Sequence, residues 1–105
     1  MDIKALAENL GLEEEEYMEL LELFLETAAA DLEKLEGALE EADADLVSST
    51  AHSLKGSSGN MGFSAFSETA RAMEMRGKEK RLDGSAEELD MLKAELAKIK
   101  ELAGK

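Results

Sequence analysis

The 105-residue chain contains no cysteine, no proline and no tryptophan. Without cysteine there is neither a disulfide framework nor a thiolate metal site, and nothing in the chain requires an oxidising compartment. Without proline nothing breaks long helices, and the abundant Ala, Leu, Glu, Lys and Met residues are strong helix formers. The sequence therefore predicts an all-α protein, and its length fits one domain over residues 1–105.

Positive charge and long apolar runs are also scarce. Twelve Lys and Arg residues stand against 25 Asp and Glu residues, which gives a formal net charge of −13. Because this charge repels phosphate backbones and anionic lipid surfaces, we expect neither nucleic acid nor a membrane as a partner. The N-terminus is acidic where a signal peptide would be basic, and no stretch is long enough to span a bilayer. We expect a cytoplasmic protein.

Apolar residues recur at helical spacing along the whole chain. The pattern predicts a short helix over residues 2–10, then helices over 13–41, 44–60 and 65–76, and a last helix that begins near residue 85. Four amphipathic helices joined by short turns pack most simply as an antiparallel up-and-down bundle. The prediction is therefore a four-helix bundle with a short additional N-terminal helix that covers one end.

Each predicted helix has a stripe of residues expected to face inward. These stripes are Ile3, Leu6, Ala7 and Leu10; Tyr17, Leu21, Phe24, Ala28, Leu32, Leu35 and Leu39; Val47, Ala51, Leu54, Ser58 and Met61; Phe66, Ala70 and Met73; and Leu89, Leu92, Leu96, Ile99 and Ala103. Asp43 is expected to cap the helix over 44–60, and Ser85 with Glu88 forms a predicted capping box. Gly11 and Gly77 are expected to end the helices before them.

The single histidine, His52, lies on the helix expected over residues 44–60. Steps of three and four residues from it define one helix face, opposite the inward stripe. This face consists of Asp45, Ser48, Ser49, His52, Lys55, Gly56 and Gly59. The imidazole should therefore point to solvent.

The residues after His52 suit the chemistry of a phosphoryl acceptor. A glycine inside a helix costs roughly 1 kcal/mol relative to alanine, so Gly56 and Gly59 need a reason other than helix stability. Helical side chains lean toward the N-terminus, and Gly56 therefore leaves the imidazole open to approach. Lys55 can turn its ammonium toward an anion carried by His52. A neutral imidazole is a competent nucleophile near physiological pH, which makes His52 the candidate acceptor.

The chain has no motif that would activate ATP by itself. A P-loop, a glycine-rich kinase loop and a receiver-type aspartate pocket are all missing. We therefore expect the phosphoryl group and its Mg²⁺ to arrive with a partner protein, and no cofactor bound by this chain. We also expect no metal site, since one histidine cannot supply the nitrogen ligands of zinc and the Asp43–Asp45 segment lacks the ligand series of a calcium loop.

The segment AHSLKGSSGNMG, residues 51–62, closely resembles the signature of the histidine phosphotransfer (HPt) domain family. The resemblance extends back over FLETAAADLEKLEGALEEADADLVSST and forward over ETARAMEMRGK to the final helix, so it covers nearly the whole chain. It implies a four-helix bundle that works as a phosphorelay intermediate. It also implies response-regulator receiver domains and a histidine kinase or hybrid kinase as partners, and a monomer.

The resemblance also implies roles for four residues. His52 would be phosphorylated on Nε2 and relay the phosphoryl group between the aspartates of two receiver domains. Lys55 would assist at the phosphoryl group, and Gly56 would clear the docking surface. Glu74, on the next helix, would accept the Nδ1 proton and fix the tautomer that presents Nε2.

Other classes of function remain as alternatives. The first is a helical scaffold in which His52 never carries phosphate, although the combination of His52, Lys55 and Gly56 argues against it. A small hydrolytic or metal-dependent enzyme ranks last, because four short amphipathic helices hardly provide a cleft. We expect a phosphoryl carrier rather than an enzyme. The initial methionine and the complete bundle favour a stand-alone chain over a piece of a hybrid kinase.

Overall fold

The computed structural model describes residues 2–104, in which the chain forms five helices and no strand. The end residues 1 and 105 of the predicted domain lie outside the described range. The helices are α1 (Ile3–Asn9), α2 (Glu14–Glu40), α3 (Ala44–Met61), α4 (Ser64–Glu79) and α5 (Ser85–Leu102). None of them combines the length and hydropathy needed to cross a bilayer.

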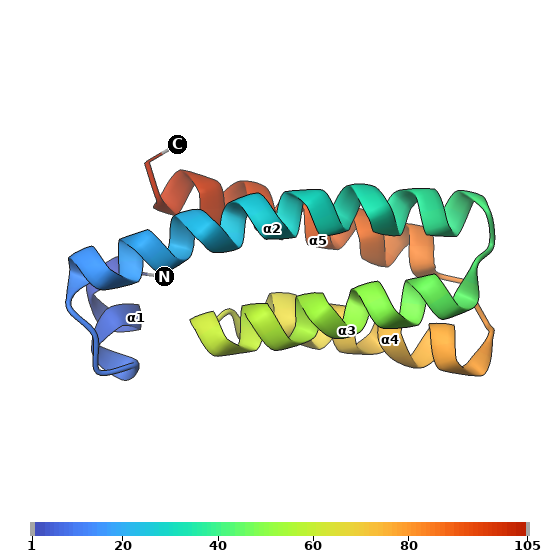
Figure 1. Ribbon diagram of the computed structural model, residues 1–105, viewed down its shortest axis with the longest axis horizontal. Helices are drawn as coiled ribbons and strands as arrows, with labels where there is room; N and C mark the ends of the chain where they lie inside the picture. Colours follow the sequence, from blue (N-terminus) through green and yellow to red (C-terminus); the bar gives the residue numbers. More distant parts are fainter. Residues whose placement is uncertain (1, 105) are drawn as a thin grey trace.

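Helices α2 to α5 run alternately in opposite directions, with α2 beside α5 in one layer and α3 beside α4 in the other (Figure 1). The short helix α1 lies across the end of the bundle where α2 begins (Figure 1). There the space above Gly62 is filled by Leu6, whose Cδ2 would lie 3.3 Å from a Cβ on that glycine. The predicted all-α bundle with an additional N-terminal helix is confirmed.

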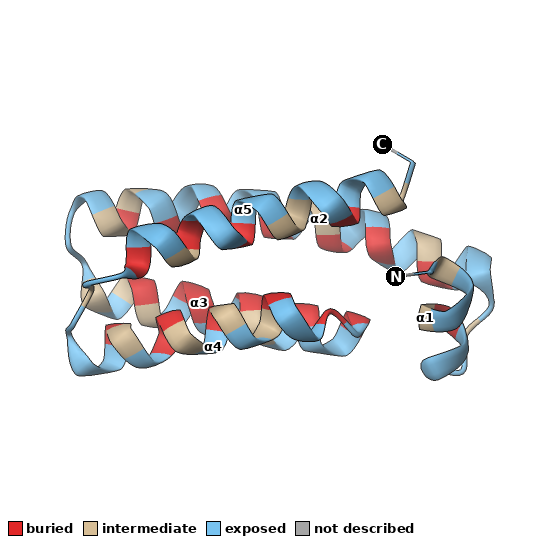
Figure 2. Cartoon of the chain, turned by 180° about the vertical axis from the view of Figure 1, so that it is seen from behind, coloured by how far each residue is buried: buried red, intermediate tan, exposed pale blue. Residues whose placement is uncertain are grey.

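The core lies between the two layers, where the buried sides of the long helices face one another (Figure 2). All five predicted inward residues of α3 are buried, as are the three of α4. The prediction that Leu10 faces inward is wrong, because α1 ends at Asn9 and Leu10 is 41% exposed. Near the end of α2 the buried residue is Ala38. The predicted inward residue Leu39 is only partly buried against the core.

The predicted end of the fourth helix at Gly77 is wrong. Helix α4 continues to Glu79, and the chain leaves the helix at Lys80, whose φ is 57°. Gly77 is buried against α3, where an added Cβ would lie 2.7 Å from the backbone nitrogen of Ser48 and 2.8 Å from the carbonyl oxygen of Ala44. Gly77 therefore lets the two helices approach closely, beside the helix that carries His52.

The predicted capping box of α5 is also wrong. Gly84 holds the N-cap position with a φ of 83°, a conformation that suits glycine, and the hydroxyl of Ser85 is buried without a hydrogen-bond partner in the described structure. Glu88 instead accepts a hydrogen bond of 2.7 Å from Nε of Arg76. Arg76 also donates to the carbonyl of Asp83, so it joins α4 to the turn that leads into α5.

Candidate functional site

His52 lies on the outer side of α3, as predicted. Asp43 caps the start of this helix by accepting a 3.1 Å hydrogen bond from the backbone N–H of Leu46. Burial of Ala51 and Leu54 fixes the rotation of the helix, and the side chain of His52 is 66% exposed. The imidazole is therefore accessible to a large partner.

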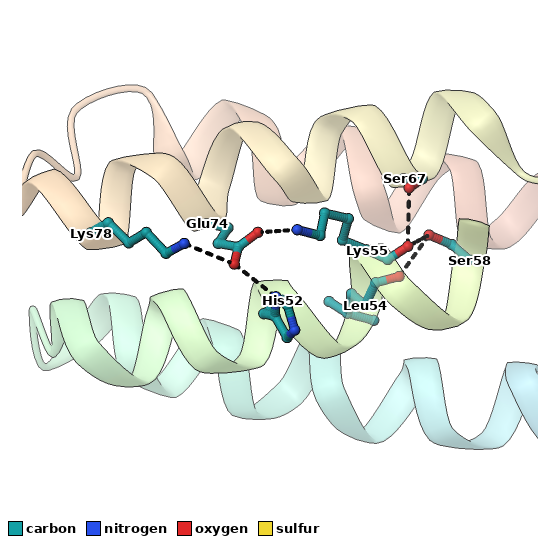
Figure 3. Close-up of polar contacts among 7 residues, drawn as sticks. All are labelled: His52, Leu54, Lys55, Ser58, Ser67, Glu74 and Lys78. Atoms are coloured by element: carbon teal, nitrogen blue, oxygen red, sulfur yellow. Dashed lines mark hydrogen bonds and ion pairs between the residues drawn. The ribbon is translucent and has the colours of Figure 1, made fainter. Parts of the chain in front are cut away.

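Glu74 holds one nitrogen of this imidazole. Its residue surface is only 4% exposed, and it reaches across from α4 to α3. Oε2 of Glu74 lies 2.8 Å from Nδ1 of His52 (Figure 3). The resemblance to the HPt family predicted this contact, and the structure contains it.

Two lysines approach the same carboxylate. Nζ of Lys55 lies 2.7 Å from Oε1, and Nζ of Lys78 lies 3.4 Å from Oε2 (Figure 3). The hydrogen bond from Lys55 is the largest influence on the pKa of Glu74; burial opposes it, while His52 and the two lysine charges add to it. Together these contacts lower the pKa of Glu74 from 4.5 to about 2, so its side chain is a carboxylate at neutral pH.

The ionised carboxylate fixes the tautomer of His52. A carboxylate can only accept hydrogen bonds, so Nδ1 must donate its proton to Glu74. The other ring nitrogen, Nε2, points away from Glu74 and carries the lone pair whenever the ring is neutral (Figure 3). The arrangement therefore presents Nε2, and not Nδ1, on the exposed side of the ring.

Lys55 lies at the site, but its ammonium contacts Glu74 rather than the open side of the imidazole. Its side chain is 32% exposed. Its backbone carbonyl accepts a 3.0 Å hydrogen bond from the hydroxyl of Ser67, which ties α4 to α3 at this turn. To reach a phosphoryl group on Nε2, the ammonium would have to leave Oε1 of Glu74.

Gly56 faces open space. An added Cβ would have no other heavy atom within 4 Å, so no contact within the described chain requires a glycine here. Gly59 differs, because an added Cβ would lie 3.4 Å from the hydroxyl oxygen of Ser67. Any need for glycine at position 56 therefore comes from what approaches the surface.

His52 borders an open hollow of about 560 Å³. The hollow is lined by Asp45, Ser48, Ser49, His52, Glu74 and Lys78. Lys78 was absent from the sequence-based site; its position four residues after Glu74 was the available signal. Residues 2–104 include no cluster of three or more His, Cys, Asp or Glu side chains that could hold a metal ion.

A second, apolar groove lies between α2 and α3. Leu20 and Leu23 are 45% and 56% exposed, and both were outside the predicted inward stripe. They line a groove of about 330 Å³ together with Phe24, Thr27, Ser57, Asn60 and Met61. The groove shares α3 with His52, and the sequence alone had left such apolar neighbours undetermined.

Comparisons with known proteins agree with this geometry. The Hpt domain family model matches residues 19–102, which include all four predicted site residues. The crystal structure of histidine-containing phosphotransfer protein B (HptB) from Pseudomonas aeruginosa is similar over 99% of this chain and 90% of that chain, with 29% sequence identity and a TM-score of 0.88. No curated protein sequence matches the chain significantly.

Proposed function

Because the chain belongs to the Hpt domain family, with its phosphotransfer role in two-component signalling, we propose that His52 is the residue that carries the phosphoryl group. The observation that supports this most directly is the 2.8 Å contact between Nδ1 of His52 and Glu74. It leaves Nε2 as the nitrogen that is free to react, on a side chain that is 66% exposed.

The proposed step is an attack on an aspartyl phosphate of a receiver domain. The lone pair of Nε2 forms a P–N bond while the P–O bond of the acyl phosphate breaks, and the aspartate leaves as a carboxylate. Nδ1 keeps its proton, and Glu74 stabilises the positive charge that the ring acquires. Lys55 offsets the charge of the phosphoryl group, and Gly56 leaves the line of approach free. Transfer to the next receiver reverses these bond changes.

Hpt proteins are phosphotransfer carriers rather than classical enzymes, and they interact with receiver domains and histidine kinases. We propose that this chain is likewise no enzyme in its own right and exchanges phosphate with a response-regulator receiver domain and a histidine kinase or hybrid kinase. Mg²⁺ would be held by the receiver, and this chain would bind no cofactor. A cytoplasmic monomer is part of the same proposal.

The receiver is proposed to dock over His52 and the apolar groove of Leu20 and Leu23. Both features border the outer side of α3, and the two leucines offer apolar surface that can be desolvated. The carrier must release one partner before it meets the next, which favours a small interface.

The test is phosphoryl transfer from a phosphorylated receiver domain with Mg²⁺ to the native chain and to His52→Ala. We expect label on the native chain alone, labile in acid and stable in alkali. Label that persists in His52→Ala would contradict the choice of residue. Absence of label on the native chain with a broad panel of receivers would favour the scaffold alternative.

A further inference from the structure

Glu74 has three basic partners, and its two oxygens do not hold them equally closely. Lys55 occupies Oε1 at 2.7 Å, and His52 occupies Oε2 at 2.8 Å. Lys78 lies farther out, 3.4 Å from the oxygen that His52 already uses, and its side chain is 60% exposed. No ion pair within the described chain joins Lys78 to Asp45, although both line the same hollow. Lys78 is therefore a loosely held cation beside a buried carboxylate.

The proposed role of Lys55 conflicts with its position in this structure. If its ammonium moves to a phosphoryl group on Nε2, Oε1 of Glu74 loses its nearest partner. Glu74 is 4% exposed and ionised, and removing one partner from a buried charge is strongly unfavourable. His52 stays on Oε2, and a second cation that takes the place of Lys55 on Oε1 would restore the charge balance of Glu74 while the imidazole is phosphorylated.

We propose that Lys78 replaces Lys55 on Glu74 when Lys55 moves to the phosphoryl group, so that the two lysines exchange on one buried carboxylate. The exchange rests on the proposed function of His52. Lys78 lies one helical turn from Glu74 on α4 and within 4 Å of its carboxylate, so a change of side-chain rotamer brings it to full contact. Lys78 is thus a positioning residue, which acts through Glu74 and Lys55 rather than on the phosphoryl group.

The test uses phosphoramidate, a small phosphoryl donor that needs no docking surface. Nε2 of His52 forms a P–N bond as the P–N bond of the donor breaks, and ammonia leaves with that electron pair. Nδ1 keeps its proton, which stays hydrogen-bonded to Glu74. The rate of labelling is measured for the native chain, Lys55→Gln, Lys78→Gln and the double variant. Lys93→Gln is the matched control, because Lys93 forms a 3.0 Å ion pair with Glu36 between α5 and α2 and does not line the His52 hollow.

We expect Lys78→Gln to slow labelling about three- to fivefold, the size expected when a partly exposed ion pair is lost. In the Lys55→Gln background the same substitution should have less than about a twofold effect, because no lysine remains to be released. Lys78→Arg should restore most of the rate, and Lys93→Gln should leave it unchanged.

A second readout follows the ammonium groups directly. Nitrogen-15 spectra of the lysine side chains are recorded for the native chain before and after labelling. We expect the Lys78 ammonium signal to sharpen on labelling as it becomes bound to Glu74, and the Lys55 signal to shift as it moves to phosphate. A merely structural role for Lys78 would change neither signal.

Equal effects of Lys78→Gln with and without Lys55 would overturn the exchange, because they would place Lys78 on the phosphoryl group itself. No effect in either background, or unchanged lysine spectra on a labelled chain, would overturn it as well. A native chain that takes no label from any donor would instead overturn the proposed function, and the exchange with it.

Discussion

At position 74 a buried carboxylate meets one imidazole and two ammonium groups. The hydrogen bond from Lys55, together with His52 and the lysine charges, lowers the pKa of Glu74 to about 2 despite its burial. The ion pairs therefore tie the protonation state of one residue to both the reactivity of His52 and the contact between α3 and α4. Acid should disturb the site and the fold together.

Replacing Glu74 with glutamine should remove part of the acid sensitivity of the fold. The folded pKa of Glu74, about 2, lies below its ordinary value of 4.5. The stabilisation is therefore fully present above pH 4.5 and is lost as the pH falls from there through 2. We expect Glu74→Gln to be less stable by on the order of 2 kcal/mol at pH 7, with the difference shrinking below pH 4.5.

The measurement is the free energy of unfolding in urea at a series of pH values from 7 to about 2.5. The other carboxylates are common to both proteins, so the difference between the curves isolates position 74. Curves that stay parallel over the whole range would mean that Glu74 is not the group responsible.

At the scale of helices, Gly77 sets how closely α4 approaches α3. An alanine Cβ would lie within 3.0 Å of backbone atoms of Ala44 and Ser48, which cannot move without shifting α3. We expect Gly77→Ala to destabilise the protein by about 1–3 kcal/mol in urea unfolding. It should also slow labelling of His52, because the two helices that carry His52 and Glu74 are pushed apart.

The control is Gly37→Ala in α2, where an added Cβ meets nothing within 4 Å. There alanine should stabilise the helix by up to about 1 kcal/mol and leave labelling unchanged. If both variants were equally stable, close packing at Gly77 would not be the reason for its glycine.

At Gly56 we expect alanine to have the opposite effect on stability from alanine at Gly77. Because its Cβ position is open, Gly56→Ala should stabilise α3 by about 1 kcal/mol in urea unfolding. Labelling by phosphoramidate should stay within about twofold of native, whereas transfer from a receiver domain should slow about tenfold, since a protein partner must approach over this surface. An equal loss with both donors would show that Gly56 matters to the imidazole itself and not to docking.

The helical pattern was sufficient to place His52, because Val47, Ala51 and Leu54 define an inward stripe that leaves His52 on the other side. It was not sufficient to place Lys78. The position of Lys78 depends on the distance and rotation of α4 against α3, which Gly77 sets by a tertiary contact. A glycine near the end of an apolar pattern looks the same in sequence whether it ends a helix or allows a close crossing.

The start of α5 likewise could not be predicted from local spacing. Ser85 and Glu88 have the spacing of a capping box, but Arg76 of α4 binds Glu88, and Gly84 adopts the left-handed conformation that begins the helix. Arg76, which competes with the N-cap for Glu88, lies 12 residues before it in the sequence. Local patterns therefore predicted the helices and the face of the site, and contacts between helices decided the rest.

At the scale of the whole molecule, an acidic protein of net charge −13 has its exposed apolar groove beside the helix that carries His52. We expect Leu23→Ser to raise the Kd for a receiver domain about tenfold, because apolar contact area is lost from the proposed interface. Labelling by phosphoramidate should be unchanged, since Leu23 does not line the hollow at His52.

Met91→Ser is the control, because Met91 is 54% exposed and Leu23 is 56% exposed, while Met91 lies on α5 outside this groove. Its Kd for the receiver, measured by calorimetry, should match that of the native chain. Equal weakening by both substitutions would mean that the groove is not the docking surface.

The exposed Nε2 has a consequence for the direction of signalling. In the proposed function, donor and acceptor react at the same nitrogen of His52, whose ring is held by the same carboxylate of Glu74. By microscopic reversibility, phosphoryl transfer from one receiver to His52 and its return to that same receiver pass through the same transition state. A carrier built in this way cannot favour one direction. The net flow of phosphoryl groups is set by the concentrations of its partners and by the free energies of hydrolysis of their aspartyl phosphates. An excess of unphosphorylated donor would therefore withdraw phosphoryl groups from the acceptor.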